Sequence, residues 1–478
     1  MTDINFTEEV EKRKDALMAD LFELLKINSE RNDDLADDAH PFGPGPVAAL
    51  EKFLKIAARD GYQTKNVDNY AGHFTYGDEL PADAEELAII GHLDVVPALA
   101  QEGWDTDPYA PVIKNGNLYA RGASDDKGPT VACYYGLKIL KELNVPLTKK
   151  IRFIVGTDEE SGWGDMDYYN AHVGLKAPDF GFSPDAEFPI INGEKGNVTE
   201  WLIFDGTNTG TVTLHSFVSG LRENMVPEVA TAVISGNDLT LSALTELLNL
   251  FVSHNADKNL TFQLTEVTGQ FTIVLHGRGA HGAMPEKGVN AATYLTAFLQ
   301  QFDFGADAKA FVTVASERLL EDHTGKKLGI AYEDDLMGNT SMNAGIWSFK
   351  EGENARIALN FRYPQGNSAE RMQEILSTID GVSAVEIGPH HMAPHYVPMT
   401  DPLVSTLLSV YEKYTGKKGY EQIIGGGTFG RLLPRGVAYG AMFEGEMDTM
   451  HQANEFKPVE NIFKAAAIYA EAIYELAK

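Results

Sequence analysis

The 478-residue sequence contains a single cysteine, Cys133, so a disulfide bond within the chain and a four-cysteine zinc site are both excluded. It also lacks any run near the ~20 apolar residues that a membrane-spanning helix needs. The most apolar stretches, Leu87–Ile90 and Ile151–Val155, have the length of strands. The first residues lack a basic segment followed by an apolar one, so we expect no secretory signal peptide and a cytoplasmic protein.

Basic residues are also scarce, with 39 Lys and Arg against 69 Asp and Glu and a net charge of -30. Such a charge repels phosphate backbones and anionic lipid surfaces, which argues against nucleic acid or a membrane as a partner. It is compatible with cationic ligands, including metal ions. Hydrophobic residues make up 44% of the chain, which excludes a wholly disordered protein.

Short apolar segments separated by helical patterns characterise the N-terminal part of the chain. Leu87–Ile90, Ile151–Val155 and Phe180–Phe182 read as strands, with a helix at about 129–143 between the first two. This alternation predicts an α/β fold, with a mostly parallel sheet sandwiched by helices. The same pattern resumes after residue 395 with a helix at 402–415, a strand around 437–443 and a final amphipathic helix. The first domain is therefore expected to comprise residues 1–192 and 396–478.

The N-terminal segment begins with a periodic apolar stretch after Thr7, which predicts one helix that reaches Ile27. Residues 33–46 are acidic and then rich in proline and glycine, which predicts a loop.

The middle of the chain, residues 193–395, has a different character. Apolar and polar residues alternate in segments such as 271–276, where Phe271, Ile273 and Leu275 would share one face of a strand. Helical stretches at 242–251, 289–302 and 368–379 are interleaved with these strands. We expect an inserted α+β lid domain with two loosely similar halves, although no fixed-period repeat is present.

Side chains that can bind metals follow the predicted strands. Ligands gather beyond the carboxyl ends of the strands in open α/β sheets, so these side chains are expected to converge. Taken singly, each has an ordinary alternative as a loop histidine, a solvated acidic turn or a helix cap. Five such segments at strand ends and before a helix favour a shared metal site. They carry His92 and Asp94, Asp125 and Asp126, Asp158 to Glu160, Asp185, and Asp448 and His451.

These segments resemble the motifs of the dinuclear zinc exopeptidases and deacylases, a family that includes carboxypeptidase G, desuccinylases, aminoacylases and carnosinase-type dipeptidases. Its bacterial Xaa-His or β-alanyl dipeptidases are the most similar branch. The order and spacing of the motifs match over nearly the whole chain, and the matching residues are Gly91–Asp94, Arg121–Gly128, Thr157–Gly162, Ser183–Asp185 and Met450–His451. Segments 183–189, 223–227 and 425–429 point to the dipeptidase branch.

The resemblance implies two zinc ions in a zinc exopeptidase-like fold. His92 and Asp185 would bind one ion, Glu160 and His451 the other, and Asp125 would bridge both. Imidazole and carboxylate ligands suit zinc. Manganese or cobalt are alternatives, because affinity alone does not select the metal.

Two further acids are expected to act in catalysis. Asp94 lies two residues after His92, and in an extended segment this places both side chains on one face, where Asp94 can accept the second ring N–H of His92. Glu159 adjoins Glu160 and would be the general base that moves a proton from water to the leaving amine. The family also implies a cis peptide between Asp125 and Asp126.

The lid would supply contacts to the substrate. His281 resembles the family's histidine that stabilises the tetrahedral oxyanion, and the guanidinium of Arg362 suits a substrate carboxylate. Asn224 would donate a further hydrogen bond. The glycines that end at Gly427 would offer main-chain N–H groups, although a plain tight turn is an equal alternative for them. The wider family often has Asp where this chain has Phe429, which separates this loop from the family pattern.

The sequence thus predicts a zinc-dependent dipeptidase that acts on Xaa-His or a broad range of dipeptides. The alternatives are an N-acyl amino acid deacylase on the same scaffold and a non-catalytic protein that binds peptides or metals. Serine catalysis is not supported, because the chain has no Gly-x-Ser-x-Gly motif. A monomer is favoured over a dimer, because a lid with two similar halves can itself fill the surface through which some relatives dimerise.

Overall fold

The computed structural model describes residues 4–99 and 103–478. The chain forms two compact units, one made of the chain up to Gly193 and from Tyr396 onward, the other of Glu194–His395. The sequence analysis placed these boundaries after residue 192 and before residue 396. Residues 1–3, part of the N-terminal segment considered for a signal peptide, lie outside the described residues.

The first unit is built on a six-stranded sheet with the order β1-β2-β6-β3-β7-β22. Neighbours from β6 to β22 pair in parallel, while β1 and β2 extend the sheet in antiparallel fashion. The predicted α/β fold with a mostly parallel sheet is therefore confirmed. The strands are β1 (Gln63–Val67), β2 (Ala71–Tyr76), β3 (Glu86–His92), β6 (Lys150–Gly156), β7 (Phe180–Ser183) and β22 (Gly436–Ala438).

Helices cover both faces of this sheet because its central strand is apolar on both sides. Leu87 and Ile89 of β3 are buried in a core that most of the helices share. Ala88 and Ile90 point to the other face and pack with residues of α5. The helices are α1 (Phe6–Glu11), α2 (Lys14–Leu25), α3 (Pro44–Arg59), α4 (Lys127–Glu142), α5 (Gly164–His172), α10 (Pro402–Thr415) and α11 (Val459–Ala477).

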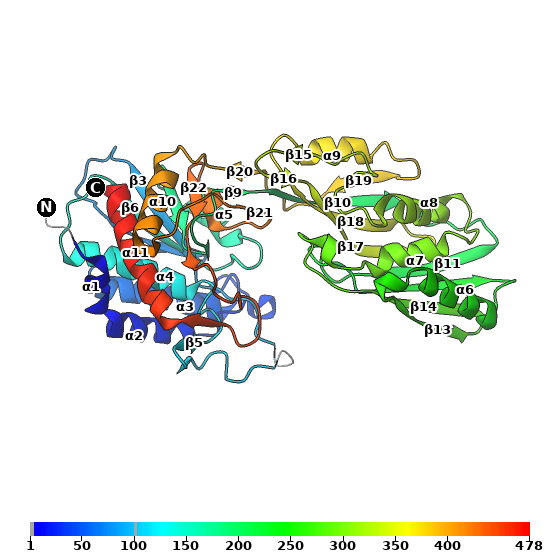
Figure 1. Cartoon of the computed structure of the whole chain (residues 1–478), viewed down its shortest axis with the longest axis horizontal. Helices are drawn as coiled ribbons and strands as arrows, with labels where there is room; N and C mark the ends of the chain where they lie inside the picture. The colour runs from blue at the N-terminus through cyan, green and yellow to red at the C-terminus, as the bar shows by residue number, and fades with distance from the viewer. Residues whose placement is uncertain (1–3, 100–102) are drawn as a thin grey trace. The chain divides into compact units, whose positions relative to one another are not determined.

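Helices α4 and α11 lie side by side and carry much of this core (Figure 1). Gly136 of α4 allows the close approach, because a Cβ atom there would lie 2.8 Å from the main-chain nitrogen of Ala470. The predicted helices at 129–143 and 402–415 correspond to α4 and α10.

Three local predictions in this unit were wrong. The single helix predicted from Thr7 is two helices, and the first is capped by Asn5, whose side chain accepts the N–H of Glu8. Helix α3 begins inside the predicted loop because Pro44, with its fixed φ, suits the first helical turn. The strand predicted at 437–443 is two short strands, β22 and β23 (Ala441–Met442), separated at Gly440, whose φ is +73°.

The second unit contains an antiparallel eight-stranded sheet with the order β13-β14-β12-β11-β17-β18-β10-β19. Phe271, Ile273 and Leu275 of β14 are all buried on one face, as the alternation predicts. The elements are β10 (Gly196–Phe204), β11 (Val212–Ser219), β12 (Val229–Gly236), β13 (Thr261–Val267), β14 (Gln270–His276), β17 (Ser341–Lys350), β18 (Ala355–Tyr363), β19 (Ala384–Ile387), α6 (Leu241–His254), α7 (Ala291–Leu299), α8 (Ala306–Val314) and α9 (Ala369–Leu376).

The strands on the two sides of the β11–β17 pair have corresponding arrangements. On one side the hairpin β11–β12 is followed in the chain by helix α6 and then the edge strand β13, and on the other β17–β18 is followed by α9 and then the edge strand β19. Strands β14 and β10 occupy the equivalent third places. The sheet therefore consists of two four-stranded halves with corresponding connections.

The remaining strands are short. They are β4 (Val112–Lys114), β5 (Asn117–Tyr119), β8 (Ala186–Glu187), β9 (Gly193–Glu194), β15 (Glu333–Asp334), β16 (Gly338–Asn339), β20 (His395–Tyr396), β21 (Ile423–Ile424) and β24 (Phe456–Pro458). Over residues 4–99 and 103–478, no helix combines the length and the apolar character needed to cross a membrane.

Candidate active site

Five of the predicted site residues meet at one edge of the six-stranded sheet. His92 is the last residue of β3, Glu160 follows β6, and Asp185 follows β7. Asp125 lies just before α4, and His451 lies in the loop that leads to β24. The carboxyl ends of parallel neighbouring strands lie at the same edge, so residues far apart in the sequence come together there.

Asp125 stands between the two histidines. Its Oδ1 lies 3.0 Å from Nε2 of His92, and its Oδ2 lies 2.9 Å from Nε2 of His451. Asp185 Oδ2 is 3.7 Å from the same atom of His92, and Glu160 Oε2 is 3.0 Å from that of His451. The donors thus form two groups, each with one imidazole and one carboxylate, and Asp125 presents one oxygen to each group.

The chemistry of these donors fits a pair of divalent cations. Glu160 Oε1 is buried and accepts no hydrogen bond from the described part of the chain. Burial raises the pKa of Glu160 to about 7, and hydrogen bonds to Asp125 and Glu160 raise that of His451 to about 11. Among the described residues, the histidines are the cationic groups that shift the pKa of Glu160. Divalent cations would supply further positive charge, and imidazole and carboxylate are ligands that zinc accepts.

Glu159 also lies within this cluster. Its carboxylate, Nε2 or Nδ1 of His92 and a carboxylate oxygen of Asp185 lie within 4.8 Å of one another, as do the corresponding atoms of His92, Asp125 and Glu160. Burial and the charge of Asp185 raise the pKa of Glu159 well above its usual value. Distance alone therefore leaves Glu159 able to serve as a base or as a ligand.

The orientation of His92 is set by hydrogen bonds around its ring. Its Nδ1 lies 3.1 Å from the main-chain oxygen of Asp94 and 3.3 Å from the Asp94 carboxylate. Both oxygens only accept, so Nδ1 carries a proton, and Nε2 would be the nitrogen that offers its lone pair to a bound metal. Nδ1 of His92 therefore faces two oxygens of Asp94: the carboxylate that the sequence analysis expected, and the main-chain oxygen, which is slightly closer.

The Asp94 carboxylate also holds the acidic loop. It accepts the main-chain N–H groups of Glu159 and Glu160, each at 3.1 Å. Asp165 of α5, fully buried, accepts the preceding N–H groups of Thr157 and Asp158 at 2.6 and 3.0 Å. Four consecutive N–H groups of this loop are thus bound by two buried carboxylates, which fixes where its side chains start.

The Asp125–Asp126 peptide is cis, as the resemblance implies. Two other contributors to the site, Asp126 and Phe429, were not predicted as such. Asp126 accepts the main-chain N–H of His92 at 3.1 Å and the hydroxyl of Thr130 at 2.7 Å. The buried ring of Phe429 lies edge-on to His92, with 6.3 Å between ring centroids. Both residues lay in motifs that the sequence analysis singled out, so their positions were available although their contacts were not.

In the second unit, two of the predicted substrate-contact residues lie on adjacent loops. Gly282 donates its N–H to the main-chain oxygen of Asn224 at 2.7 Å, which brings Asn224 beside the loop of His281. His281 Nδ1 accepts the N–H of Ala283 at 3.1 Å, so the neutral ring carries its proton on Nε2. Both side chains are exposed.

The other predicted substrate contacts lie on different elements. Arg362 is a largely buried residue near the end of β18, where it pairs with Ser341 of β17. Gly427, half-buried in the first unit, lies in the loop between β21 and the 3₁₀ turn Phe429–Leu432.

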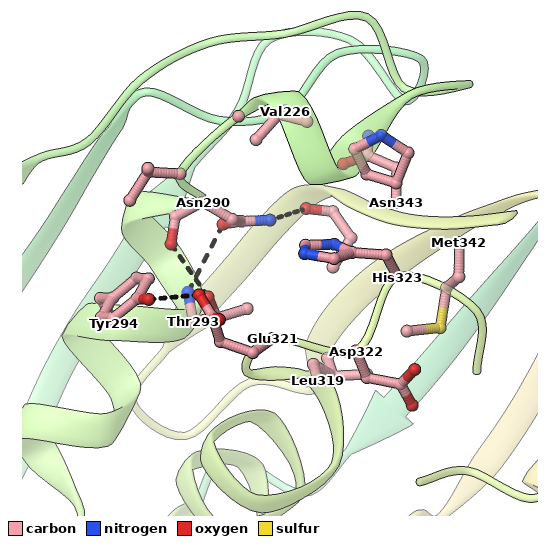
Figure 2. Close-up of a pocket in the computed structure, with 14 residues that line it drawn as sticks. Val226, Asn290, Thr293, Tyr294, Leu319, Glu321, Asp322, His323, Met342 and Asn343 are labelled. Atoms are coloured by element: carbon pink, nitrogen blue, oxygen red, sulfur yellow. Dashed lines mark hydrogen bonds between the residues drawn. The ribbon is translucent and has the colours of Figure 1, made fainter. Parts of the chain in front are cut away.

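A small pocket of the second unit is lined in part by Val226 and Asn343 (Figure 2). The buried amide of Asn343 donates to the main-chain oxygens of Glu223 and Met225, each at 2.8 Å, and so anchors both neighbours of Asn224. The acids of this pocket serve its own structure, because Glu321 accepts the hydroxyl of Tyr294 and Asp322 accepts main-chain N–H groups. We therefore interpret it as a structural pocket.

Comparison with known proteins identifies relatives of the whole chain. The sequence model of "Peptidase family M20/M25/M40" matches residues 88–475. The β-Ala-Xaa dipeptidase of Lactobacillus delbrueckii subsp. lactis is 44% identical over 481 residues, which cover 100% of this chain and 99% of that protein.

Among solved structures, human carnosine dipeptidase 1 has a TM-score of 0.57 at 15% identity and covers 98% of both chains. The aminoacylhistidine dipeptidase of Vibrio alginolyticus has a TM-score of 0.55 at 15% identity, over 96% of this chain and 97% of that one. At these identities the two structures show a shared fold.

Proposed function

The chain belongs to the peptidase family M20/M25/M40, and on that premise we propose that it is a dipeptidase that uses two zinc ions. The observation that carries this proposal is the position of Asp125, whose two carboxylate oxygens face two different histidines. A single carboxylate shared in this way is what a two-metal site requires. The Lactobacillus relative, named a β-Ala-Xaa dipeptidase, supports dipeptides as the substrates.

Within this proposal, His92 and Asp185 hold one zinc ion, Glu160 and His451 hold the other, and Asp125 bridges them. Two bound zinc ions would supply Lewis-acid chemistry, which polarises the scissile carbonyl and lowers the pKa of a water molecule toward neutrality. Asp94 keeps Nδ1 of His92 protonated and holds the acidic loop in place.

Glu159 is proposed as the general acid and base. Its carboxylate takes a proton from the attacking water and delivers it to the leaving amine, which converts a poor leaving group into a neutral one. The main chain of Glu159 is fixed by Asp94, so proton transfer needs only movement of the side chain.

For the second unit, we propose that Nε2–H of His281 donates to the oxyanion of the tetrahedral intermediate, with a further hydrogen bond from Asn224. Arg362 and the main chain at Gly427 would bind the substrate's carboxylate. A carboxylate bound at a fixed distance from the scissile bond selects short substrates. We also propose a monomer, because the two corresponding halves of the eight-stranded sheet already pair with each other through β11 and β17.

Hydrolysis of matched amides tests this function. The zinc-loaded protein is incubated with β-Ala-His, Ala-His and other dipeptides, with a tripeptide, and with N-acetyl and N-succinyl amino acids, and the released amino acids are quantified. The proposal expects turnover of dipeptides at rates well above those of the other compounds. Turnover restricted to the acylated amino acids would contradict it and would identify a deacylase.

A further inference from the structure

Glu455 is a fully buried acid that the proposed mechanism does not use. Its Oε1 accepts the main-chain N–H groups of Ser124 and Asp125 at 2.7 and 3.1 Å. Its Oε2 accepts the N–H of Gly122 at 3.1 Å and Nη1 of Arg121 at 3.0 Å. Four donors on two oxygens account for the usual acceptor capacity of a carboxylate, so this group is committed to the protein and is not a metal ligand.

The contacts of Glu455 join the segment that carries Asp125 to the segment that carries His451. Asp125 belongs to the loop from Arg121 to Asp126, which Glu455 binds at three main-chain nitrogens. The main-chain oxygen of Glu455 also accepts the N–H of Ala120, at 3.2 Å. His451 lies only four residues before Glu455 on the same loop. The carboxylate therefore ties the segment that carries His451 to the segment that carries Asp125.

Backbone conformation makes this tie important for the second group of donors. His451 has a φ of +61° and Asn454 also has a φ of +61°, a left-handed region that is unfavourable for residues other than glycine. Such a loop needs external contacts to keep its shape. Glu455 follows this turn directly, and its carboxylate accepts four hydrogen bonds from the loop that carries Asp125.

We propose that Glu455 is a positioning residue that sets the distance between Asp125 and His451 and thereby controls the affinity of the metal position formed by Asp125, Glu160 and His451. The inference rests on the proposed two-metal function. Glu455 contacts the main chain of Asp125, the proposed bridging ligand, and contacts of this kind around metal ligands commonly tune metal affinity. The position of His92 and Asp185 shares Asp125 but not His451, and among the described residues neither His92 nor Asp185 is hydrogen-bonded to Glu455, so this position is expected to lose less affinity.

Metal titration of the apoprotein tests this proposal without reference to any substrate. Zn²⁺ is titrated in competition with a chromophoric chelator into the wild type and into Glu455→Gln. This substitution keeps the size of the side chain but replaces one acceptor oxygen by an NH₂ group, which cannot accept the N–H donors that face it. We expect two tight sites in the wild type. In Glu455→Gln we expect one site weakened by about 10–100-fold and the other weakened less. Two sites of wild-type affinity in the variant would overturn the proposal.

A matched control separates this effect from general loss of stability. Glu446 is another buried carboxylate of the same C-terminal region, paired with Lys457 at 2.8 Å and hydrogen-bonded to Asn461. Glu446→Gln removes a comparable buried charge and is expected to keep both zinc sites. Equal weakening of one site in Glu446→Gln would show that stability and not positioning is responsible.

A second variant keeps the proposal testable if Glu455→Gln does not fold. Glu455→Asp retains the charge but withdraws the oxygens by one methylene, so it should weaken the same site less than the amide does. Unchanged affinity in Glu455→Asp together with unfolding of Glu455→Gln would assign Glu455 a role in folding alone. A wild type that binds two zinc ions but cleaves no dipeptide would reject the proposed substrate and leave the inference on Glu455 intact.

Discussion

Asp94 accepts the main-chain N–H of Glu159 through Oδ1, at 3.1 Å. The main-chain oxygen of Asp94 accepts a hydrogen bond from Nδ1 of His92, so Asp94 contacts both a candidate metal ligand and the candidate base. A residue with this position influences both metal binding and proton transfer, although it provides neither a ligand nor a reacting group.

The first prediction therefore concerns Asp94→Asn. An amide nitrogen in place of one oxygen would face a main-chain N–H donor, and the acidic loop would shift away from it. We expect kcat to fall by about 10–100-fold, the usual effect of losing an outer contact of a metal site. Asp179→Asn is the control, because Asp179 also accepts a main-chain N–H, that of Glu86, at the opposite end of β3. Steady-state kinetics with a dipeptide decides, and equal activities of the two variants would contradict the role.

The second prediction is that chelation abolishes activity and that zinc, manganese or cobalt restores it. Burial and the charge of Asp125 raise the pKa values of Glu160 and Asp185, and bound cations would compensate this buried negative charge. Activity is measured after dialysis against chelator, with metal content determined by elemental analysis. Full activity in protein verified to contain no metal would reject the account.

The third prediction concerns His281→Ala. Loss of a hydrogen bond to the oxyanion should lower kcat by about 10²–10³-fold while both metals stay bound, because His281 contributes to neither group of donors. His254→Ala provides the control, since His254 is an exposed residue in the last turn of α6. Near-normal kcat for His281→Ala would leave this residue with a purely structural role in its loop.

The fourth prediction is a pH dependence of stability that arises in the second unit. Glu200 of β10 is fully buried, and neither of its carboxylate oxygens accepts a hydrogen bond within the described ranges. Burial, with the nearby charge of Glu370, raises the pKa of Glu200 from 4.5 to about 8. The folded state therefore holds a proton that the unfolded state loses, so this group lowers stability progressively between those two pH values.

Glu200→Gln removes this titration. The melting temperature of the variant relative to the wild type should rise as the pH increases from 5 to 8.5, by roughly 2–4 °C for each kcal/mol of destabilisation relieved. Glu266→Gln, at an exposed position of β13, is the control and should show no such trend. A difference that does not change with pH would contradict the assignment. Thermal melts are followed at constant ionic strength.

Much of the fold and the candidate site could be predicted because the signals are local. Strand β3 is an apolar run followed by polar residues, and its parallel neighbours β6 and β7 have the same form, so the gathering of His92, Glu160 and Asp185 follows from the sheet. Helix α4 has clear apolar periodicity and was located to within a few residues. These features depend on neighbours in the sequence.

The contacts that were missed depend on residues far apart in the chain. Glu455 lies 330 residues from Asp125, and nothing in its own segment distinguishes it from a solvated acid. The spacing of two correctly predicted that the carboxylate of Asp94 faces His92, but not that it also accepts the N–H of Glu159, 65 residues away. Spacing predicts which face a side chain occupies, whereas the choice among acceptors on that face is decided by tertiary structure.

The two neighbouring glutamates provide the most direct test of the account, and the measurement is the metal content of Glu159→Gln and Glu160→Gln, determined beside kcat. Glu159→Gln should retain two metals per chain and lose about 10²–10⁴-fold in kcat, because an amide cannot carry the proton. Glu160→Gln should lose the metal held with His451, because a neutral amide oxygen is a weaker ligand than a carboxylate. Loss of metal from Glu159→Gln, with two metals retained and only slower turnover in Glu160→Gln, would contradict the assignment of both residues.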